Sequence, residues 1–265
     1  MKKIYISADI EGVAGAFQRE SVRPGSPLYP SLCRRMTNEV LAAVSAINDT
    51  CEARIIVKDA HLNGNNLLLD DFPSNCEIRL GWEEHPYMMA EGLDSSFDHF
   101  FCIGYHSAAG SGASPLSHTI NSQKFKKILI NGTPASELLI HYYLSGMLGV
   151  PLSFVSGDWG ICNEAVRLSP DTVIVPTFSG QGNGILSKSP KLVQKEIYQG
   201  IQLALSGPSP LPAVLPASFH IEVSFFRCAD AHRASFYPGA FLKNDDTIQF
   251  DTENYYDLLT LLMFI

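Results

Sequence analysis

The stretch Ile4-Tyr5-Ile6-Ser7-Ala8-Asp9-Ile10-Glu11-Gly12 determines the fold that we expect for this chain of 265 residues. Its β-branched and aromatic residues predict a strand over residues 4–8, and two carboxylates follow the strand at once. Side chains of an extended chain repeat every second residue, so Asp9 and Glu11 project from one face, roughly 6.5–7 Å apart. One cation fits between them, although a solvated acidic strand end followed by a turn explains the pair equally well.

Strand-like and helix-like patterns alternate beyond this stretch. We expect helices near 32–48, 135–148 and 191–205, and strands over 54–58, 100–104, 127–130, 152–156 and 172–175. This alternation is typical of βαβ units. The sequence therefore predicts an α/β fold with a mostly parallel central sheet and flanking helices.

A break in regular structure follows the last of these helices, at Ser206-Gly207-Pro208-Ser209-Pro210-Leu211-Pro212. Proline fixes φ and removes a backbone donor, so no helix or strand continues through this segment. We expect a main metal-binding domain over residues 1–205. Residues 206–265, with strand patterns at 219–226 and 247–251 and a helical tail at 254–265, predict a smaller α/β segment packed on it.

Charge and composition limit the classes of partner. The formal net charge is −8 at pH 7 and the chain has no run of Lys or Arg, which argues against nucleic acid and anionic membranes. The six cysteines are scattered without a Cys-x-x-Cys pair, and the first strand begins too early for a signal peptide. We expect reduced cysteines, a cytoplasmic location, and a small molecule or short peptide as the substrate.

Potential metal ligands lie at the ends of several predicted strands. His61 follows the strand at 54–58 and His106 follows the strand at 100–104. Ligands bind at the carboxyl ends of parallel strands, so both histidines can converge with Asp9 and Glu11. Imidazoles and carboxylates suit Zn²⁺, and two cations about 3.5–4 Å apart can share a carboxylate and activate a bridging water. We predict a metallohydrolase with two Zn²⁺ per chain.

Two further residues complete this candidate site. Glu137 is the fifth candidate ligand, although a glutamate in the first turn of a helix is ordinarily explained by the helix dipole. The carboxylates of Asp9, Glu11 and Glu137 set against two Zn²⁺ leave one positive charge, which a bridging hydroxide would neutralise. His118, beside a stretch of small residues, is either an aid to proton transfer or nucleophilic attack or an ordinary surface histidine.

Two acidic residues are weaker candidates for contacts behind the ligands or with substrate. Asp59 precedes His61 by two residues and either orients a histidine or binds metal itself. Asp158 ends the strand that begins at residue 152. The glycine-rich residues 179–184 lack the spacing of a phosphate-binding loop, so we expect an ordinary loop without chemistry there.

The motifs together resemble the M55 metallopeptidases, the D-aminopeptidase family, over nearly the whole chain. The motifs that carry the resemblance are Ser7-Ala8-Asp9-Ile10-Glu11-Gly12, Asp59-Ala60-His61 with Asn65-Asn66-Leu67, Glu91-Gly92-Leu93-Asp94, Gly104-Tyr105-His106, Ser117-His118, Ile130-Asn131-Gly132 with Glu137, and Ser156-Gly157-Asp158. One departure is Trp159, where family members often carry a second acidic residue.

The resemblance implies more than the residues alone do. It implies two zinc ions, held at the positions of Asp9, Glu11, His61, His106 and Glu137, with Asp9 bridging and His118 catalytic. It also implies removal of an N-terminal D-amino acid from short peptides, and a large ring-like homo-oligomer, a decamer in the family.

Two other functions remain open from the residues. A different dinuclear hydrolase, either a non-peptide amidase or a phosphoesterase, could use the same ligands, but a phosphoesterase needs cations and Lys58 is one of few near the motifs. A non-catalytic metabolite-binding α/β protein would hold no stoichiometric zinc.

Overall fold

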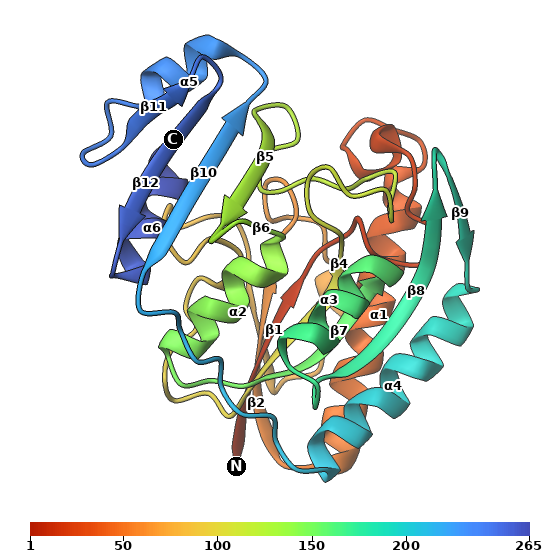
Figure 1. Ribbon diagram of the computed structural model, residues 1–265. Helices are drawn as coiled ribbons and strands as arrows, with labels where there is room; N and C mark the ends of the chain where they lie inside the picture. Colours follow the sequence, from red (N-terminus) through yellow and green to blue (C-terminus); the bar gives the residue numbers. More distant parts are fainter.

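The computed structural model describes residues 1–265 and contains a seven-stranded central sheet in the order β3-β2-β1-β4-β7-β8-β9 (Figure 1). Its strands are β1 (Lys2–Ala8), β2 (Ala53–Asp59), β3 (Cys76–Arg79), β4 (His99–Tyr105), β7 (Leu152–Asp158), β8 (Val173–Gln181) and β9 (Gly184–Ser187). All neighbouring strands run parallel except β8 and β9. The predicted mostly parallel central sheet is confirmed.

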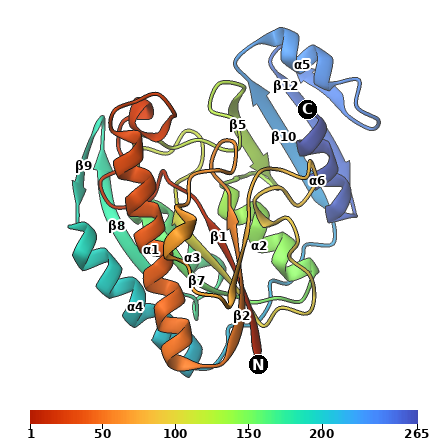
Figure 2. The same ribbon diagram turned by 180° about the vertical axis from the view of Figure 1, so that it is seen from behind.

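Helices cover both faces of this sheet (Figures 1 and 2). They are α1 (Tyr29–Thr50) and α4 (Pro190–Ser206) on one face, and α2 (Glu137–Met147) and α3 (Trp159–Leu168) on the other. Ile4 and Ile6 of β1 pack against the first pair, whereas Tyr5 faces the second core. Because β1 is buried on both sides, it reads in sequence as a continuous apolar run.

The sequence analysis did not predict α3. This helix starts directly after β7, without an intervening loop, and the Asp158 side chain accepts a hydrogen bond from Ile161 N at its first turn. The sequence signal for this helix was available. It consists of an aspartate at the capping position followed by the apolar residues Ile161, Cys162 and Ala165, which form the buried face.

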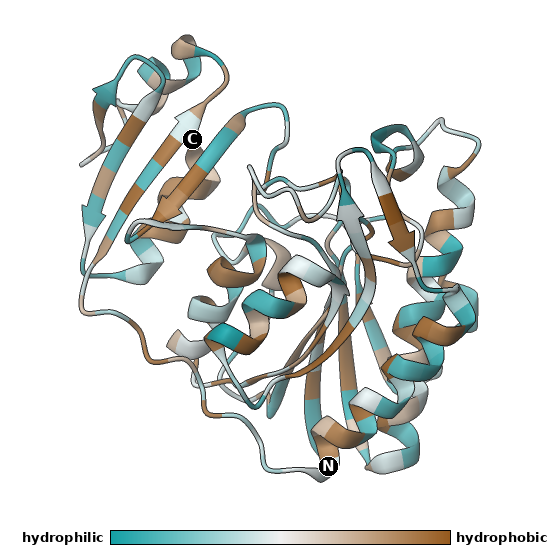
Figure 3. Cartoon of the chain, turned by 45° about the vertical axis from the view of Figure 1, so that its right-hand side comes forward, coloured by the Kyte–Doolittle hydropathy of each residue, from teal (hydrophilic) through white to brown (hydrophobic).

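A second sheet of five strands, in the order β11-β12-β10-β5-β6, is antiparallel throughout. Its strands are β5 (Phe125–Ile130), β6 (Thr133–Pro134), β10 (Phe219–Phe225), β11 (Phe241–Asn244) and β12 (Thr247–Thr252). Buried and partly exposed residues alternate along β10, and Figure 3 shows the matching bands of apolar and polar residues. Helix α6 (Tyr255–Phe264) packs against this sheet and α2, and α5 (Cys228–Ala234) lies at its far end.

The strand expected at 127–130 does not belong to the central sheet, so this part of the prediction was wrong. It forms β5, which turns into β6 and pairs with β10. The second sheet thus takes two strands from the chain before residue 206, and its core is continuous with that around α2 and α3. The division into residues 1–205 and 206–265 stays a prediction.

The glycine-rich residues 179–184 form a β-hairpin instead of the expected loop. Strand β8 continues to Gln181, and Gly182, with φ +58°, turns the chain into β9. Short 3-10 helices occupy the loops, namely η1 (Arg19–Val22), η2 (Leu69–Asp71) and η3 (Met88–Ala90). No helix combines the length and the apolar character that crossing a lipid bilayer requires. All six cysteines are free thiols.

Candidate metal centre

The candidate ligands lie where three adjacent strands of the central sheet end. Asp9 and Glu11 follow β1, His61 follows β2 and His106 follows β4, and β1 pairs with both of the other strands. The chain builds one side of the sheet from β1 through β2 and β3, and then returns to the other side of β1 with β4. Ligands bind at such a reversal of strand order in open α/β sheets.

Two glycines allow the loop after β1 to touch the end of β4. Gly12 N donates to Gly104 O at 2.8 Å, and Asp9 N donates to Ile103 O at 2.8 Å. A Cβ atom on Gly12 would collide with Tyr105 O, and one on Gly104 with Asp9 O. The absence of side chains at these two positions therefore brings Asp9 close to His106.

The first group of ligands consists of Asp9, Glu11 and His61, which we call the first triad. His61 Nδ1 lies 2.8 Å from Glu11 Oε2 and 3.3 Å from Asp9 Oδ1. All three side chains are buried. The two carboxylates follow the end of β1 in a turn, so they face His61 without the strand alternation that the sequence suggested.

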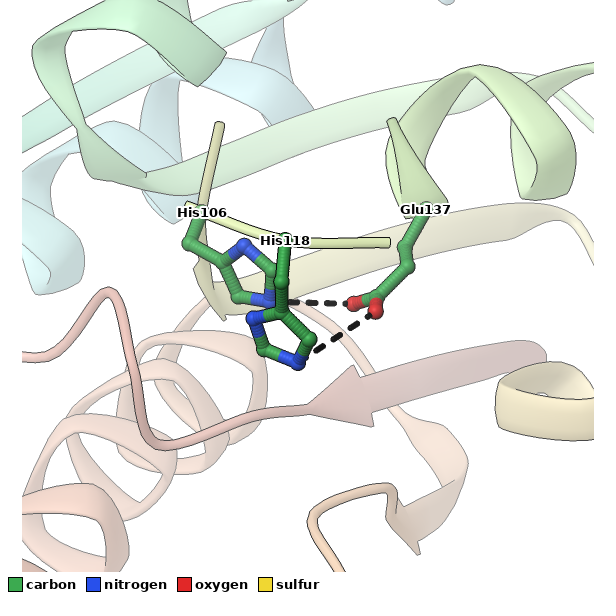
Figure 4. Close-up of side chains that lie close together, drawn as sticks. All are labelled: His106, His118 and Glu137. Carbon is green, nitrogen blue, oxygen red and sulfur yellow. Dashed lines mark ion pairs between the residues drawn. The ribbon is translucent and has the colours of Figure 1, made fainter. Parts of the chain in front are cut away.

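The second group consists of His106, His118 and Glu137, which we call the second triad (Figure 4). His106 Nε2 lies 3.2 Å from Glu137 Oε2, and His118 Nε2 lies 3.9 Å from Glu137 Oε1. The two imidazole rings stack with their centroids 4.3 Å apart. His118 thus shares Glu137 with His106 and remains 17% exposed, whereas the other two residues are buried.

Asp9 connects the two triads. Its Oδ1 atom faces His61, and its Oδ2 atom lies 3.5 Å from His106 Nε2. A carboxylate that presents one oxygen to each of two groups has the geometry of a bridging ligand.

Each of the three histidines has one ring nitrogen against a backbone carbonyl. His61 Nε2 lies 2.6 Å from Val22 O, His106 Nδ1 lies 3.0 Å from Ser107 O, and His118 Nδ1 lies 2.8 Å from Leu116 O. A carbonyl oxygen only accepts, so these nitrogens carry the proton. The opposite nitrogen of each neutral ring then presents a lone pair to carboxylates, an arrangement that a cation between them satisfies.

Two buried atoms at this site make no hydrogen bond, namely Glu11 Oε2 and His106 Nε2. Buried polar atoms without a partner are rare and costly in proteins. Glu11 Oε2 belongs to the first triad and lies beside His61 Nδ1, and His106 Nε2 belongs to the second triad and lies beside Glu137 and Asp9. The donor set therefore fits a pair of divalent cations, and imidazole with carboxylate suits zinc.

The charges of the site interact strongly when no cation separates them. Burial and the Glu11 carboxylate raise the pKa of Asp9 to about 8. Burial alone would raise the pKa of Glu137, but the His106 imidazole outweighs it and lowers this pKa to about 2. Burial would lower the pKa of His61, yet Glu11 and Asp9 raise it well above its usual value. Burial and the neighbouring His106 lower the pKa of His118.

Asp59 lies behind the first triad and does not contact the His61 ring. Its carboxylate accepts hydrogen bonds from Asn66 N at 2.5 Å, Asn66 Nδ2 at 2.6 Å and Leu67 N at 2.8 Å. Asn66 Nδ2 also donates to His61 O at 2.7 Å. Asp59 therefore holds the loop that carries His61.

Asp158 has the corresponding place behind the second triad. Its carboxylate accepts hydrogen bonds from the backbone N and the Oγ of Ser107, both at 2.6 Å, and caps α3. Ser107 follows His106 directly. Asp158 thus holds the loop after β4 in place, next to the candidate ligand His106.

A buried ion pair that we did not predict supports the wall of the site. Lys58 Nζ lies 3.2 Å from Glu91 Oε2 and 4.2 Å from the centre of the Trp82 ring. Trp82 Nε1 donates to Leu62 O at 2.6 Å, next to His61. The available signal was a lysine within the apolar run Ile55-Ile56-Val57-Lys58, because a buried lysine needs a charged partner.

Both triads open into one cavity of about 1160 Å³. Asp9, Glu11, His61, His118 and Glu137 line it, together with apolar side chains from several loops and from α6. Buried carboxylates and imidazoles that meet at the strand ends, below a cavity of this size, define the site of a metallohydrolase.

Comparisons with known proteins agree with this class. The family model of the M55 peptidases, described as D-aminopeptidase, matches residues 1–264. A D-aminopeptidase of Bacillus subtilis (strain 168) is 27% identical over 256 residues, which cover 95% of this chain and 92% of the relative. The chain belongs to the M55 peptidase family and is a D-stereospecific peptide hydrolase, which confirms the resemblance seen in the sequence.

A solved structure has the same fold. It is described as the Zn-dependent D-aminopeptidase DppA from Bacillus subtilis, a self-compartmentalizing protease. The two structures superimpose with a TM-score of 0.91 at 24% identity, over 98% of this chain and 95% of that chain.

Proposed function

We propose that this protein is a zinc-dependent aminopeptidase with a dinuclear centre that removes an N-terminal D-amino acid from short peptides. The observation that carries the proposal is the position of Asp9, whose two oxygens face the two triads separately. The proposed ligands are Glu11 and His61 for one ion, His106 and Glu137 for the other, and Asp9 for both. The zinc dependence of the structural relative supports the choice of metal.

The residues of the site have distinct parts in this proposal. Bound zinc would polarise the scissile carbonyl and lower the pKa of a bound water. His118 is positioned to move a proton, because its Nδ1–H donates to Leu116 O and its Nε2 stays free beside Glu137. Asp59 and Asp158 hold the loops of His61 and His106, and do not react themselves.

Assembly and location also belong to the proposal. The related DppA is described as self-compartmentalizing, which supports a homo-oligomer. The ring-like decamer that we propose rests on the family resemblance alone. Large apolar side chains on α6 and in the loops after β10 and α5 are available for such contacts, because Phe226, Phe236 and Phe264 are each at least 60% exposed. Light scattering behind a sizing column measures the number of subunits. A cytoplasmic location stays a prediction.

The test combines metal content with stereospecific hydrolysis. We expect about two zinc ions per purified chain, release of D-Ala from D-Ala-D-Ala but no cleavage of L-Ala-L-Ala, and loss of activity on chelation that added zinc restores. Two bound metals without peptide cleavage would point to another dinuclear amidase or a phosphoesterase. A protein that holds no metal and gains no activity from zinc would refute the proposal.

A further inference from the structure

Three cationic side chains line the same cavity as the metal ligands, namely Arg19, Arg23 and Lys124. None of them forms an ion pair, whereas Lys58, the other lysine near the site, is paired with Glu91. The chain as a whole carries an excess of acidic residues, with 27 Asp and Glu against 19 Lys and Arg. Carboxylates are thus plentiful in the chain, yet these three cations have no carboxylate partner.

Arg23 has the most direct connection to the metal centre. It follows Val22, whose carbonyl oxygen receives the His61 Nε2 proton at 2.6 Å. Ser21 and Val22 are buried at the end of η1. The backbone of Arg23 is therefore fixed next to Val22, the residue that contacts His61. Arg23 itself is half-buried, and its guanidinium makes no hydrogen bond within the protein.

Arg19 differs from Arg23 in having a partner. Its Nη1 donates to Ser122 Oγ at 3.1 Å, which joins η1 to the loop before β5 across the cavity. Lys124 lies on this same loop, with Nζ 5.6 Å from the centre of the Phe125 ring. Arg23 and Lys124 both keep their side-chain donors free of hydrogen bonds within the protein, but only Arg23 lies next to the residue that holds His61, and only Arg23 carries a planar guanidinium.

The chemistry of the cavity indicates what this guanidinium binds. Asp9, Glu11 and Glu137 are offset by the two zinc ions of the proposed function, and many other side chains around the cavity are apolar, so a carboxylate that leaves water for this cavity needs a cationic partner of its own. A planar guanidinium matches a carboxylate with two parallel hydrogen bonds. A short peptide carries such a carboxylate at its C-terminus, and an extended dipeptide spans only about 7 Å.

We propose that Arg23 binds the free C-terminal carboxylate of the peptide substrate and so restricts the enzyme to short peptides with a free C-terminus. The inference rests on the proposed aminopeptidase function, in that the N-terminal end of the peptide lies at the metal centre. Arg23 is a binding residue in this scheme and takes no part in bond cleavage.

The test compares D-Ala-D-Ala with its C-terminal amide in wild type, Arg23→Gln and Arg23→Lys. We expect wild type to prefer the free acid in kcat/KM, and Arg23→Gln to lower kcat/KM for the acid by roughly tenfold to hundredfold through KM. Hydrolysis of the amide should change little, so the acid-to-amide ratio falls toward one. Arg23→Lys should keep part of the preference because it keeps the charge. Arg167→Gln, an exposed arginine on α3 outside the cavity, is the control for the change in net charge.

Calorimetric titration of zinc-loaded His118→Asn protein, with and without Arg23→Gln, with the same two ligands separates this inference from the proposed function. Tighter binding of the acid than of the amide, lost in Arg23→Gln, supports the inference even if no peptide is cleaved. Equal binding of acid and amide, no binding of either, or an acid-to-amide ratio that Arg23→Gln leaves unchanged overturns it. Absence of hydrolysis by wild type with added zinc refutes the aminopeptidase proposal alone.

Discussion

The two triads of the site are built in different ways. The first triad takes Asp9, Glu11 and His61 from the ends of β1 and β2, which are neighbours in one parallel sheet. The second triad takes His106 from the end of β4, but His118 lies in a long loop and Glu137 begins α2, separated by two residues from β6 of the second sheet. The first triad thus depends on one sheet, whereas the second depends on how two sheets pack.

Supporting contacts show the same contrast. Behind the first triad, Asp59 holds a loop that stays within eight residues of it in the chain. In the second triad, Ile120 N donates to Glu137 Oε1 at 2.6 Å and Thr119 Oγ1 donates to Ala135 O at 2.7 Å, so the His118 loop and the start of α2 hold each other. The second triad is also the more accessible one, through His118. Both triads line the cavity, but only the second has a side chain, that of His118, which is partly exposed to it.

Removing the residue shared by both triads should have the largest effect. Asp9→Asn keeps the shape of the side chain but removes the charge that faces His61 and His106. We expect zinc content to fall below two per chain and kcat to fall by at least about 10³-fold. Elemental analysis and D-Ala-D-Ala hydrolysis measure both, with exposed Asp70→Asn as the control. Two retained zinc ions would show that Asp9 does not bridge.

Removing one carboxylate from each triad tests whether the triads are separate. Glu11→Gln and Glu137→Gln should each leave about one zinc ion per chain and lower kcat by roughly 10²–10³-fold. Gln at position 137 still accepts from Ile120 N, so the melting temperature should change little. If either variant loses both ions, the two triads act as a single cluster and the comparison fails.

Replacing His118 distinguishes two roles for this partly exposed residue, namely proton transfer and zinc binding. His118→Asn should keep two zinc ions and lower kcat by roughly 10²–10³-fold, because a proton acceptor is lost without a ligand. Zinc content and kcat are measured together on the same preparation. Loss of one ion would instead make His118 a ligand, which its distance of 3.9 Å between Nε2 and Glu137 Oε1 also allows.

The last prediction concerns stability and leaves the metal ligands unchanged. It involves Glu39, a buried carboxyl that supports the loop after β1, which carries Asp9 and Glu11. Glu39 accepts a hydrogen bond from Ala14 N at 2.9 Å, and burial raises its pKa from 4.5 to about 8. The unfolded chain releases this proton at lower pH than the folded protein, so wild type loses stability as the pH rises from about 5 through 8. Glu39→Gln cannot titrate and should be more stable than wild type by at least about 2 kcal/mol at pH 9, since the full rise of the pKa from 4.5 to about 8 corresponds to an upper bound of about 5 kcal/mol.

Urea unfolding at pH 5 and pH 9 measures this difference in the free energy of unfolding. The advantage of Glu39→Gln should be small at pH 5, where Glu39 is protonated in the folded protein, and should grow toward pH 9. An advantage that is the same at both pH values would mean that Glu39 is charged in the folded state.

The sequence by itself determined the features that rest on local pattern. The apolar runs before Asp9, His61 and His106 predict parallel strands, and the rule for strand ends then predicts that these residues approach one another. The family resemblance also came from the order of the motifs alone. Local pattern failed where a segment's partner is distant, as for residues 127–130, which pair with β10 some 90 residues later.

Only the tertiary structure decided how the site is arranged. That Asp9 presents one oxygen to each triad depends on the contact between the loop after β1 and the end of β4, which Gly12 and Gly104 permit. The meeting of Glu137 with His106 depends on the packing of the second sheet against the first. Spacing along the chain carries no information on such contacts, because they are made between side chains whose positions are set by elements far apart in sequence.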